Sequence, residues 1–293
     1  IGGDSDDNLS GGGGNDDLTS GLGSDTLTGG SNNDTFRSSA GTNLITDLTT
    51  GDILIVSAGS IANATNISAF VATSSTSNSG TANLTAGSSG STITMTNSSA
   101  GAYTLTGGTG SDTFDISAVA ARANHDNITD FADVGTTTSD IVKIAAANTT
   151  AATAAGSTPT VLTVTPPTDT ADGAAYTIIG SSTGTVDIVE FTALPNAANA
   201  TLGGTEDIAD SEELFKALAV AGANKEIGKI VVNAAADKFY IVAYDNNDAF
   251  IYFADAGTGN TDLVKGEVNY VATISGTGNI AVAGLDATDF VLA

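Results

Sequence analysis

The sequence predicts an all-β protein, with a parallel β-roll in its N-terminal part and an antiparallel β-domain with one short helix after it. Three observations lead to this fold class. A nine-residue pattern recurs from residue 2, strand-like alternation of apolar and polar residues recurs beyond residue 145, and the composition favours strands and turns. The 293 residues are enough for two or three modest domains.

The charge balance restricts the classes of partner and chemistry. Eight Lys+Arg against 33 Asp+Glu give a net charge of −25, which excludes nucleic acid and disfavours anionic membranes. Dense acidic charge instead attracts divalent cations or keeps an exposed protein soluble. With no cysteine and one histidine, the chain cannot form a disulfide, a catalytic thiol or a multi-histidine zinc site. No apolar run approaches the ~20 residues of a transmembrane helix.

The repeat begins at Gly2 and continues through six units of nine residues without an insertion. The first four units are GGDSDDNLS, GGGGNDDLT, SGLGSDTLT and GGSNNDTFR. The sixth positions are Asp7, Asp16, Asp25, Asp34, Asn43 and Asp52. The eighth positions are Leu9, Leu18, Leu27, Phe36, Ile45 and Leu54. A flexible Gly/Asp linker has no reason to carry a buried-type residue at every ninth position, so the pattern predicts folded structure.

This pattern resembles the RTX nonapeptide, G-G-x-G-x-D-x-U-x, in which U is a large apolar residue. The second unit, GGGGNDDLT, matches every fixed position, and four consecutive units followed by two degenerate ones in phase make the resemblance specific. We therefore predict a first domain, an RTX β-roll, over residues 1–56. In this interpretation GGxGxD is a turn whose glycines permit positive φ, and xUx is a short strand with its central residue inward.

Two such units form one turn of the roll, so residues 18 positions apart stack about one strand spacing, ~4.8 Å, from each other. Asp7 then lies close to Asp25, and two carboxylates at that distance repel each other. A calcium ion between them reverses the sign of the interaction, because calcium accepts six to eight oxygen ligands. Loop carbonyl oxygens can supply the ligands that the aspartates do not.

The resemblance implies a set of calcium ligands. The implied carboxylate pairs are Asp7 with Asp25, Asp16 with Asp34 and, as a third candidate, Asp34 with Asp52. The turn residues assigned to the same sites are Gly12, Gly14, Gly21, Gly23, Gly30 and Asn32. Asn43 stacks under Asp25 and is neutral, so we expect the site at that step to be weaker or absent.

Residues 57–144 are predicted to form a second, degenerate RTX/β unit. The motif returns as GGTGSDTFD, and the following NITDFADVGTTTSDIVKI is similar to the NLITDLTTGDILIV that closes the first block. Asp112 lies 18 residues before Asp130, which makes this pair a candidate calcium site. In the same alignment Asp140 corresponds to Asp52 after an insertion. Between the blocks, the apolar spacing in 57–92 predicts one short helix or a covering loop.

Residues 145–293 are predicted to be a C-terminal β-rich domain that begins with a linker. A helix is expected over 210–222, capped by Ser211 and ended by Gly222. Carboxylates flank a predicted hairpin at Asp237, Asp245, Asp248 and Asp255. We interpret them as turn and strand-end residues, because a glycosidase cleft would need aromatic platforms and the chain has no tryptophan.

The two ends of the sequence suggest how it is exported. The chain ends in GLDATDFVLA, which resembles the C-terminal export signal of RTX proteins secreted by the type I route. It begins at Ile1 in mid-repeat, so we expect a C-terminal portion of a longer chain. We predict an extracellular, non-enzymatic, calcium-binding structural protein of the bacterial cell surface. The predicted protein is similar to RTX-type surface-layer proteins, and we expect it to self-assemble into a lattice or filament.

The expected partners are further copies of the chain joined through calcium, and a cell-surface polysaccharide bound by a part upstream of Ile1. No nucleic-acid partner and no transmembrane segment is expected. Two alternatives remain open. The chain could be the calcium and secretion module of an RTX exoenzyme or toxin, which a catalytic motif upstream would reveal. It could also be a cell-surface adhesin, which an exposed aromatic cluster would favour; the candidates are Tyr240, Tyr244, Tyr252 and Phe253.

Overall fold

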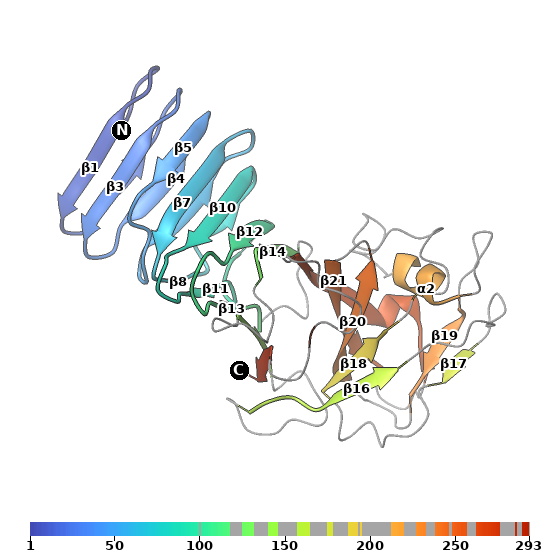
Figure 1. Cartoon of the computed structure of the whole chain (residues 1–293). Coiled ribbons are helices and arrows are strands. Elements are labelled where there is room, and N and C mark those ends of the chain that lie inside the picture. The colour runs from blue at the N-terminus through green and yellow to red at the C-terminus, as the bar shows by residue number, and fades with distance from the viewer. Residues whose placement is uncertain are drawn as a thin grey trace. The chain divides into compact units, whose positions relative to one another are not determined.

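The computed structural model divides the chain into two compact units, Ile1–Val119 with Asn124–Lys143, and Ala120–Ala123 with Ile144–Ala293. Strands dominate both units (Figure 1), so the all-β prediction is confirmed. The structure describes residues 1–99, 101–117, 125–131, 140–145, 157–164, 175–177, 187–192, 194, 212–219, 227–232, 238–245, 248–256, 262–275, 285 and 289–292.

One side of the first unit is a stack of parallel strands, each paired with the next along the stack. The strands are β1 (Asn8–Gly13), β3 (Thr26–Ser31), β5 (Thr42–Ile45), β7 (Ile61–Ile67), β10 (Thr81–Ala86), β12 (Tyr103–Thr106) and β14 (Asp126–Thr129). We call this stack the long sheet. Parallel pairing with short turns between strands is the geometry expected of a roll, because each strand must be followed by a crossing to the other side.

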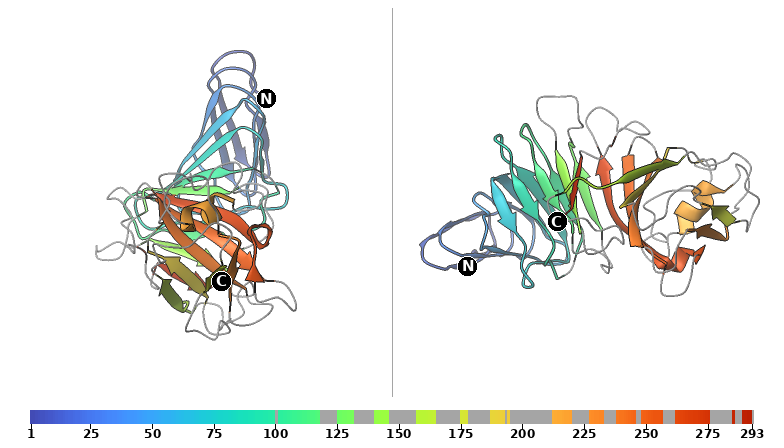
Figure 2. Two further views of the ribbon diagram at one scale, coloured as in Figure 1. Left: turned by 90° about the vertical axis from the view of Figure 1, so that its right-hand side faces the viewer. Right: turned by 90° about the horizontal axis from the view of Figure 1, so that it is seen from below.

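The other side of the first unit consists of two shorter parallel sheets. The first contains β2 (Asp17–Thr19), β4 (Thr35–Ser38), β6 (Ile53–Val56) and β9 (Ser77–Asn78). The second contains β8 (Ala69–Val71), β11 (Thr92–Thr94), β13 (Thr113–Asp115) and β15 (Ile141–Ile144). Figure 2 shows the successive turns of the roll from two further directions.

The register of the first turns follows the repeat. Leu9 pairs with Leu27 in the long sheet, and Leu18 pairs with Phe36 on the other side. The inward residues Leu18, Leu27, Phe36, Ile45 and Leu54 are all buried. Removing a side chain of this size from water stabilises the fold by about 1.5–3 kcal/mol. The predicted inward position of the eighth residue is therefore confirmed for these five units.

The interpretation of 57–92 as a helix or covering loop is wrong. These residues form β7, β8, β9 and β10, and they continue the parallel stack without a break. Their inward positions are occupied mainly by small residues such as Ala62, Ala64 and Ala82, which are fully buried. Small inward residues give a weak periodic signal, yet they pack because the neighbouring turns already fix the spacing of the strands.

The second unit contains a sheet in the order β23–β21–β20–β18–β16. Its strands are β16 (Val161–Val164), β18 (Ile188–Phe191), β20 (Lys238–Asp245), β21 (Asp248–Asp255) and β23 (Val268–Ser275). The hairpin of β20 and β21 and its pairing with β23 are antiparallel, as predicted. The pairs β16–β18 and β18–β20 are parallel, which the prediction missed.

Smaller elements complete the described part of the second unit. They are β17 (Ala175–Thr177), β19 (Lys229–Val231), β22 (Asp262–Leu263), the 3-10 helix η4 (Lys265–Glu267), β24 (Phe290–Leu292) and the helix α2 (Glu212–Leu218). The helix α2 lies inside the predicted 210–222 and buries Leu214, Phe215 and Leu218. The Nζ of Lys216 lies 2.6 Å from the Oε1 of Glu213 and 3.1 Å from the Oε1 of Glu212. Both carboxylates raise the pKa of the Lys216 ammonium group.

Candidate calcium-binding site

One repeated hydrogen bond builds the carboxylate columns of the roll. The side-chain Oδ1 of one residue accepts the backbone N–H of the residue 18 positions earlier. In the first column, Asp25 accepts from Asp7 at 2.9 Å and Asn43 accepts from Asp25 at 3.0 Å. The predicted stacking of Asp7 near Asp25 is therefore present in the structure.

The second column contains Asp16, Asp34 and Asp52. The Oδ1 of Asp34 accepts the N–H of Asp16 at 2.8 Å, and the Oδ1 of Asp52 accepts the N–H of Asp34 at 2.8 Å. Each carboxylate thus joins two successive turns of the roll. A hydrogen bond to a charged acceptor is about twice as strong as a neutral one, so the columns hold the turns in register.

The columns bury carboxylates that have unsatisfied oxygens. Asp25 and Asp34 are 1% and 2% exposed. The Oδ2 atoms of Asp16 and Asp25 are buried, and no described residue donates a hydrogen bond to either of them. A buried carboxylate oxygen without a partner costs free energy, so these two atoms mark places where a cation would be stabilising.

The surroundings of Asp34 in the second column disfavour its ionised form. Burial raises the pKa of Asp34, and the hydrogen bond from the N–H of Asp16 acts in the opposite direction. The charges of Asp52, Asp16 and Asp47 raise the pKa further. The proximity of like charges and the loss of water therefore both disfavour the charged form of this carboxylate, and a divalent cation would stabilise that form.

The turns between strands place main-chain oxygens next to the carboxylates. The predicted turn residues have positive φ angles, from 82° to 110°, at Gly12, Gly14, Gly21, Gly23, Gly30 and Asn32. At Gly30 an added Cβ would lie 2.0 Å from the carbonyl oxygen of Gly12. Only glycine permits this approach of two backbones.

The carbonyl oxygens and carboxylates converge on common points. The position that a Cβ of Gly11 would occupy lies 2.6 Å from the Oδ2 of Asp16 and 2.6 Å from the carbonyl oxygen of Gly29. Within the described ranges, no three Asp, Glu or His side chains gather closely enough to hold a metal by themselves. Main-chain oxygens must supply the remaining ligands, which suits calcium, a cation that takes six to eight oxygens.

Both columns end in residues whose side chains are already satisfied. The Nδ2 of Asn43 donates to Ser38 Oγ at 2.8 Å and to the carbonyl oxygen of Ala40 at 2.8 Å. The Oδ2 of Asp52 accepts the N–H of Thr49 at 2.8 Å and its hydroxyl at 3.0 Å. Residues Asn43 and Asp52 therefore have less capacity to bind an ion than Asp16 and Asp25.

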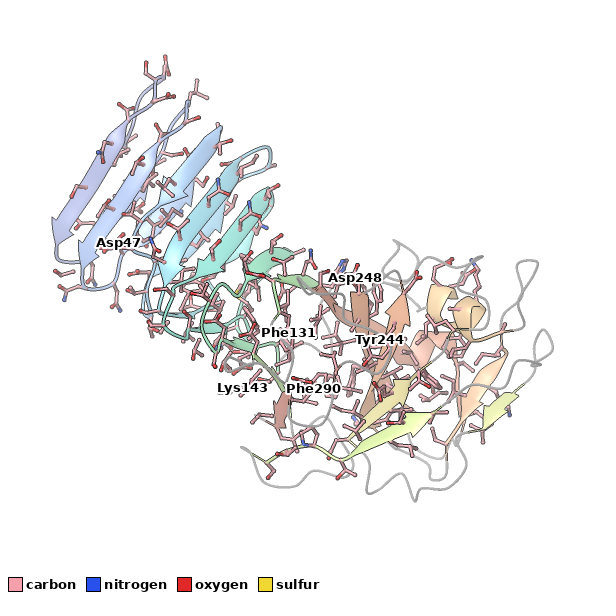
Figure 3. The ribbon with its side chains drawn as sticks, viewed as in Figure 1. Asp47, Phe131, Lys143, Tyr244, Asp248 and Phe290 are labelled. Carbon is pink, nitrogen blue, oxygen red and sulfur yellow. The ribbon has the colours of Figure 1, made fainter. Side chains whose placement is uncertain are left out.

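Asp47 contributes to the turns, although the prediction did not place it in the site (Figure 3). Its Oδ1 accepts the N–H of Gly29 at 2.9 Å and its Oδ2 accepts the N–H of Gly30 at 2.8 Å. The shared I-T-D-(L/F) segment that contains Asp47 and Asp130 is the sequence signal that could have identified it.

The second predicted pair differs in the structure. The N–H of Asp112 donates to the Oδ1 of Asp140 at 2.8 Å, across 28 residues, and the Oδ1 of Asp112 accepts the N–H of Ser91 at 2.7 Å. Asp140, and not Asp130, therefore continues the ladder after Asp112. The spacing of 18 gave the wrong ladder partner for Asp112, because this turn of the roll is 28 residues long. Asp130 still lies near Asp112, since its carbonyl oxygen and the Oδ2 of Asp112 both approach the Cβ position of Gly107.

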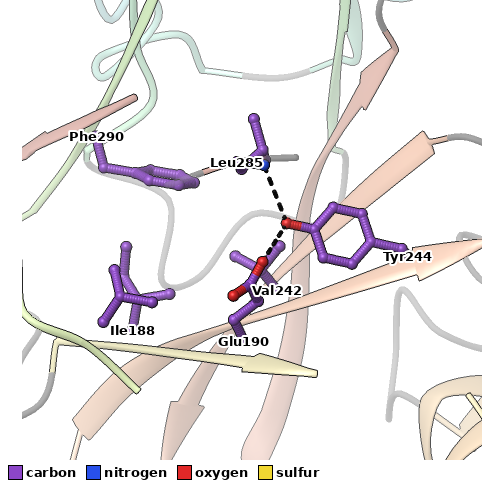
Figure 4. Close-up of a pocket in the computed structure, with 7 residues that line it drawn as sticks. Ile188, Glu190, Val242, Tyr244, Leu285 and Phe290 are labelled. Atoms are coloured by element: carbon purple, nitrogen blue, oxygen red, sulfur yellow. Dashed lines mark hydrogen bonds between the residues drawn. The ribbon is translucent and has the colours of Figure 1, made fainter. Parts of the chain in front are cut away.

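The second unit contains a buried carboxylate that the sequence did not reveal. Glu190 is 4% exposed. Its Oε1 accepts the Tyr244 hydroxyl at 2.6 Å, and the Leu285 N–H approaches the Tyr244 oxygen at 3.4 Å (Figure 4). Its Oε2 accepts the Thr163 hydroxyl at 3.0 Å. Burial and then the neighbouring Glu190 raise the pKa of Tyr244. Since both carboxylate oxygens are satisfied by hydroxyl groups, we assign this cluster to the interior packing of the unit.

The hairpin carboxylates lie at strand ends. Asp245 and Asp248 are register partners at the closed end of β20 and β21, and Asp255 lies 2.8 Å from Lys238 at the other end. Asp237 lies outside the described residues. This placement fits the interpretation of these aspartates as turn and strand-end residues.

The region of the carboxylate columns matches a known protein family. Residues 1–36 and 10–45 match the family model of the RTX calcium-binding nonapeptide repeat, which covers four copies. The N-terminal part of the roll carries RTX repeats. These repeats bind calcium, and a bound ion would supply the positive charge that offsets the repulsion between stacked carboxylates. No curated protein and no solved structure matches the chain.

Proposed function

We propose that this RTX repeat protein is a secreted structural protein that assembles into an array on the bacterial surface and uses calcium to stabilise its roll. RTX repeat proteins are typically secreted. Among the described residues, no helix is long and apolar enough to cross a membrane. We also propose that the protein lies on the cell surface and is exported by the type I route.

The observation that carries the assembly proposal is the outer face of the long sheet. In its seven described strands, none of the outward side chains is charged. Threonine and asparagine predominate, as at Thr104 and Thr106 on β12. The opposite side of the roll carries charges, for example at Asp17 and Lys143. In a chain of net charge −25, an uncharged face is where two copies can approach without repulsion.

The size of this face suits a repeated weak contact. Seven strands at about 4.8 Å spacing and a width of about 10 Å give about 300 Å². A stable dimer buries about 800 Å² on each partner. One such contact is therefore too small to hold two molecules, and a stable array needs further contacts, for which calcium between acidic surfaces is our proposed source.

Export provides a reason for the calcium dependence. Phe290 and Leu292, in the segment that resembles an export signal, are 2% and 0% exposed. A receptor could read these side chains only while the chain is unfolded. We propose that the acidic repeats remain unfolded at the low calcium concentration inside the cell and fold at the high concentration outside, because the ion binds only the folded roll.

The test is a calcium titration of the metal-free protein, followed by circular dichroism and by light scattering. We expect strand content and particle size both to increase. Thr104→Lys should reduce the growth in particle size, whereas Thr92→Lys, which adds the same charge to β11 on the opposite side, should not. Unchanged particle size in the wild-type protein would refute the assembly proposal.

The alternatives make different predictions in the same titration. Folding without assembly would favour a calcium and secretion module of an exoenzyme or toxin. The adhesin alternative depended on exposed aromatic residues, but the four candidates are buried. Their exposed fractions are 2% for Tyr240, 5% for Tyr244, 0% for Tyr252 and 4% for Phe253. These side chains offer no aromatic platform to a sugar.

A further inference from the structure

A buried carboxylate outside the matched repeats has an oxygen atom without a partner. Asp112, immediately before β13, is 1% exposed. Its Oδ1 accepts the Ser91 N–H at 2.7 Å, but no described residue donates a hydrogen bond to its buried Oδ2. Because such an atom is costly inside a protein, a cation or a proton must stabilise it.

Two further oxygen atoms face the same small space. The position that a Cβ of Gly107 would occupy lies 3.5 Å from the Oδ2 of Asp112, 2.9 Å from the Oδ2 of Asp140 and 2.8 Å from the carbonyl oxygen of Asp130. The three oxygens come from three separate segments of the first unit. Glycine at position 107 leaves the space between them open.

The local backbone and charges fit a bound cation. Asp130 has a φ of 59°, in the left-handed region that non-glycine residues rarely adopt. Burial raises the pKa of Asp112, the hydrogen bond from the Ser91 N–H lowers it, and the charge of Asp130 raises it again. The carboxylate is therefore held among like charges in a place with little water, where a divalent cation would stabilise it.

We propose that Asp112, Asp140 and the carbonyl oxygen of Asp130 form an additional divalent-cation site. The all-oxygen ligand set selects a hard cation such as calcium, with water completing the coordination. Because the third ligand is a main-chain carbonyl, the described residues need form no cluster of three acidic side chains here, and they form none. The ion would join β13 to β15 across a turn of 28 residues, where the matched repeats use 18.

This proposal rests on the calcium-binding part of the proposed function and does not require self-assembly. The experiment is hydrogen exchange of the full chain, with calcium chloride or with a chelator, read on peptides covering residues 101–117 and 125–131. Those peptides report this site separately from the repeats in residues 1–56. In the wild-type protein we expect calcium to slow their exchange at least tenfold.

The variant Asp140→Asn keeps the oxygen that accepts the Asp112 N–H but removes the charge. We expect it to lose most of the calcium effect on these peptides, while in the chelator it exchanges no faster than the wild-type protein, because a repulsion has been removed. Asp115→Asn is the matched control. It removes one charge from the partly exposed end of the same strand and should leave the calcium effect intact.

Three results would overturn the proposal. Calcium could slow exchange equally in Asp140→Asn and in the wild-type protein, in which case Asp140 does not hold the ion. Calcium could protect only residues 1–56, in which case a proton stabilises Asp112 and lowering the pH protects residues 101–117 without calcium. Asp140→Asn could exchange faster than the wild-type protein in the chelator, in which case no repulsion existed. None of these results depends on particle size, so failure of assembly is a separate finding.

Discussion

Replacing Asp34 by asparagine separates the structural effect of its carboxylate from the effect of its charge. Asparagine keeps an Oδ1 that can accept the N–H of Asp16, now held at 2.8 Å, and the backbone N–H that donates to Asp52 at 2.8 Å is unchanged. The substitution removes the negative charge and replaces the second carboxylate oxygen by an amide NH2 group. In the metal-free protein the substitution should therefore stabilise the roll, and with calcium it should weaken it.

The magnitude follows from the spacing of the column. Two unit charges about 4.8 Å apart repel by about 0.9 kcal/mol at the dielectric constant of water and by about 3.5 kcal/mol at an effective value of about 20. Asp34 has one such neighbour on each side, Asp16 and Asp52. Changing a charged acceptor to a neutral one costs about 1 kcal/mol. The net expected gain without calcium is at least about 1 kcal/mol.

Hydrogen exchange on residues 1–56 measures both effects, because the protection factor gives the free energy of local opening. In a chelator, a gain of about 1 kcal/mol corresponds to about fivefold slower exchange in Asp34→Asn. With calcium, we expect the concentration for half-maximal protection to rise at least tenfold, about 1.4 kcal/mol. Asp17→Asn is the control, because this exposed aspartate pairs with Arg37 at 2.8 Å outside the columns.

The reasoning would be refuted if Asp34→Asn exchanged faster than the wild-type protein in the chelator. The carboxylate would then stabilise the roll without metal, and repulsion in the column would be unimportant. An unchanged calcium midpoint would separately show that Asp34 is not a ligand.

Three further predictions concern the turns, pH and the interior of the second unit. Gly30→Ala should destabilise the roll by more than about 2 kcal/mol in urea unfolding, because its φ is 107° and its Cβ would meet a carbonyl oxygen, whereas Gly13→Ala, with open space around it, should be nearly neutral. The raised pKa of Asp34 means that the folded state binds the proton more tightly than the unfolded state, so the metal-free protein should lose stability as pH rises from 3.8 through the raised pKa. Calcium-loaded protein should show the opposite trend, since protons compete with the ion. If the free energy of unfolding in urea changed with pH equally in the metal-free and calcium-loaded proteins, this prediction would be contradicted. Tyr244→Phe should cost about 1–3 kcal/mol in thermal unfolding, because Glu190 loses a donor at 2.6 Å, and a cost near zero would show that the Glu190 oxygen finds another partner.

The strict part of the repeat made the first turns predictable. A constant spacing of 18 fixes which residues stack, so the inward Leu27 and the column of Asp16 and Asp34 follow from counting alone. The prediction lost accuracy where turns change length. The pairing of Asp112 with Asp140 depends on a 28-residue turn, and nothing in the local sequence sets that length.

Two other features depend on contacts between distant segments. The strands β7 and β10 carry inward alanines such as Ala62 and Ala82, whose hydrophobic signal is too weak to predict a strand without its neighbours. In the second unit, alternation predicts that β16 and β18 are strands but contains no information on the direction of pairing. That direction is set by the connection between them, and the pairing is parallel.

The alternation of sides along the roll restricts how the gene can change in length. One nonapeptide supplies a strand to the long sheet and the next supplies a strand to the opposite side, as the pairs Leu9 with Leu27 and Leu18 with Phe36 show. Loss of a single nonapeptide would transfer every later strand to the wrong side and mix the two columns. Loss or gain of 18 residues would preserve both. Recombination among the repeats should therefore leave folded descendants only when it adds or removes nonapeptides in even numbers.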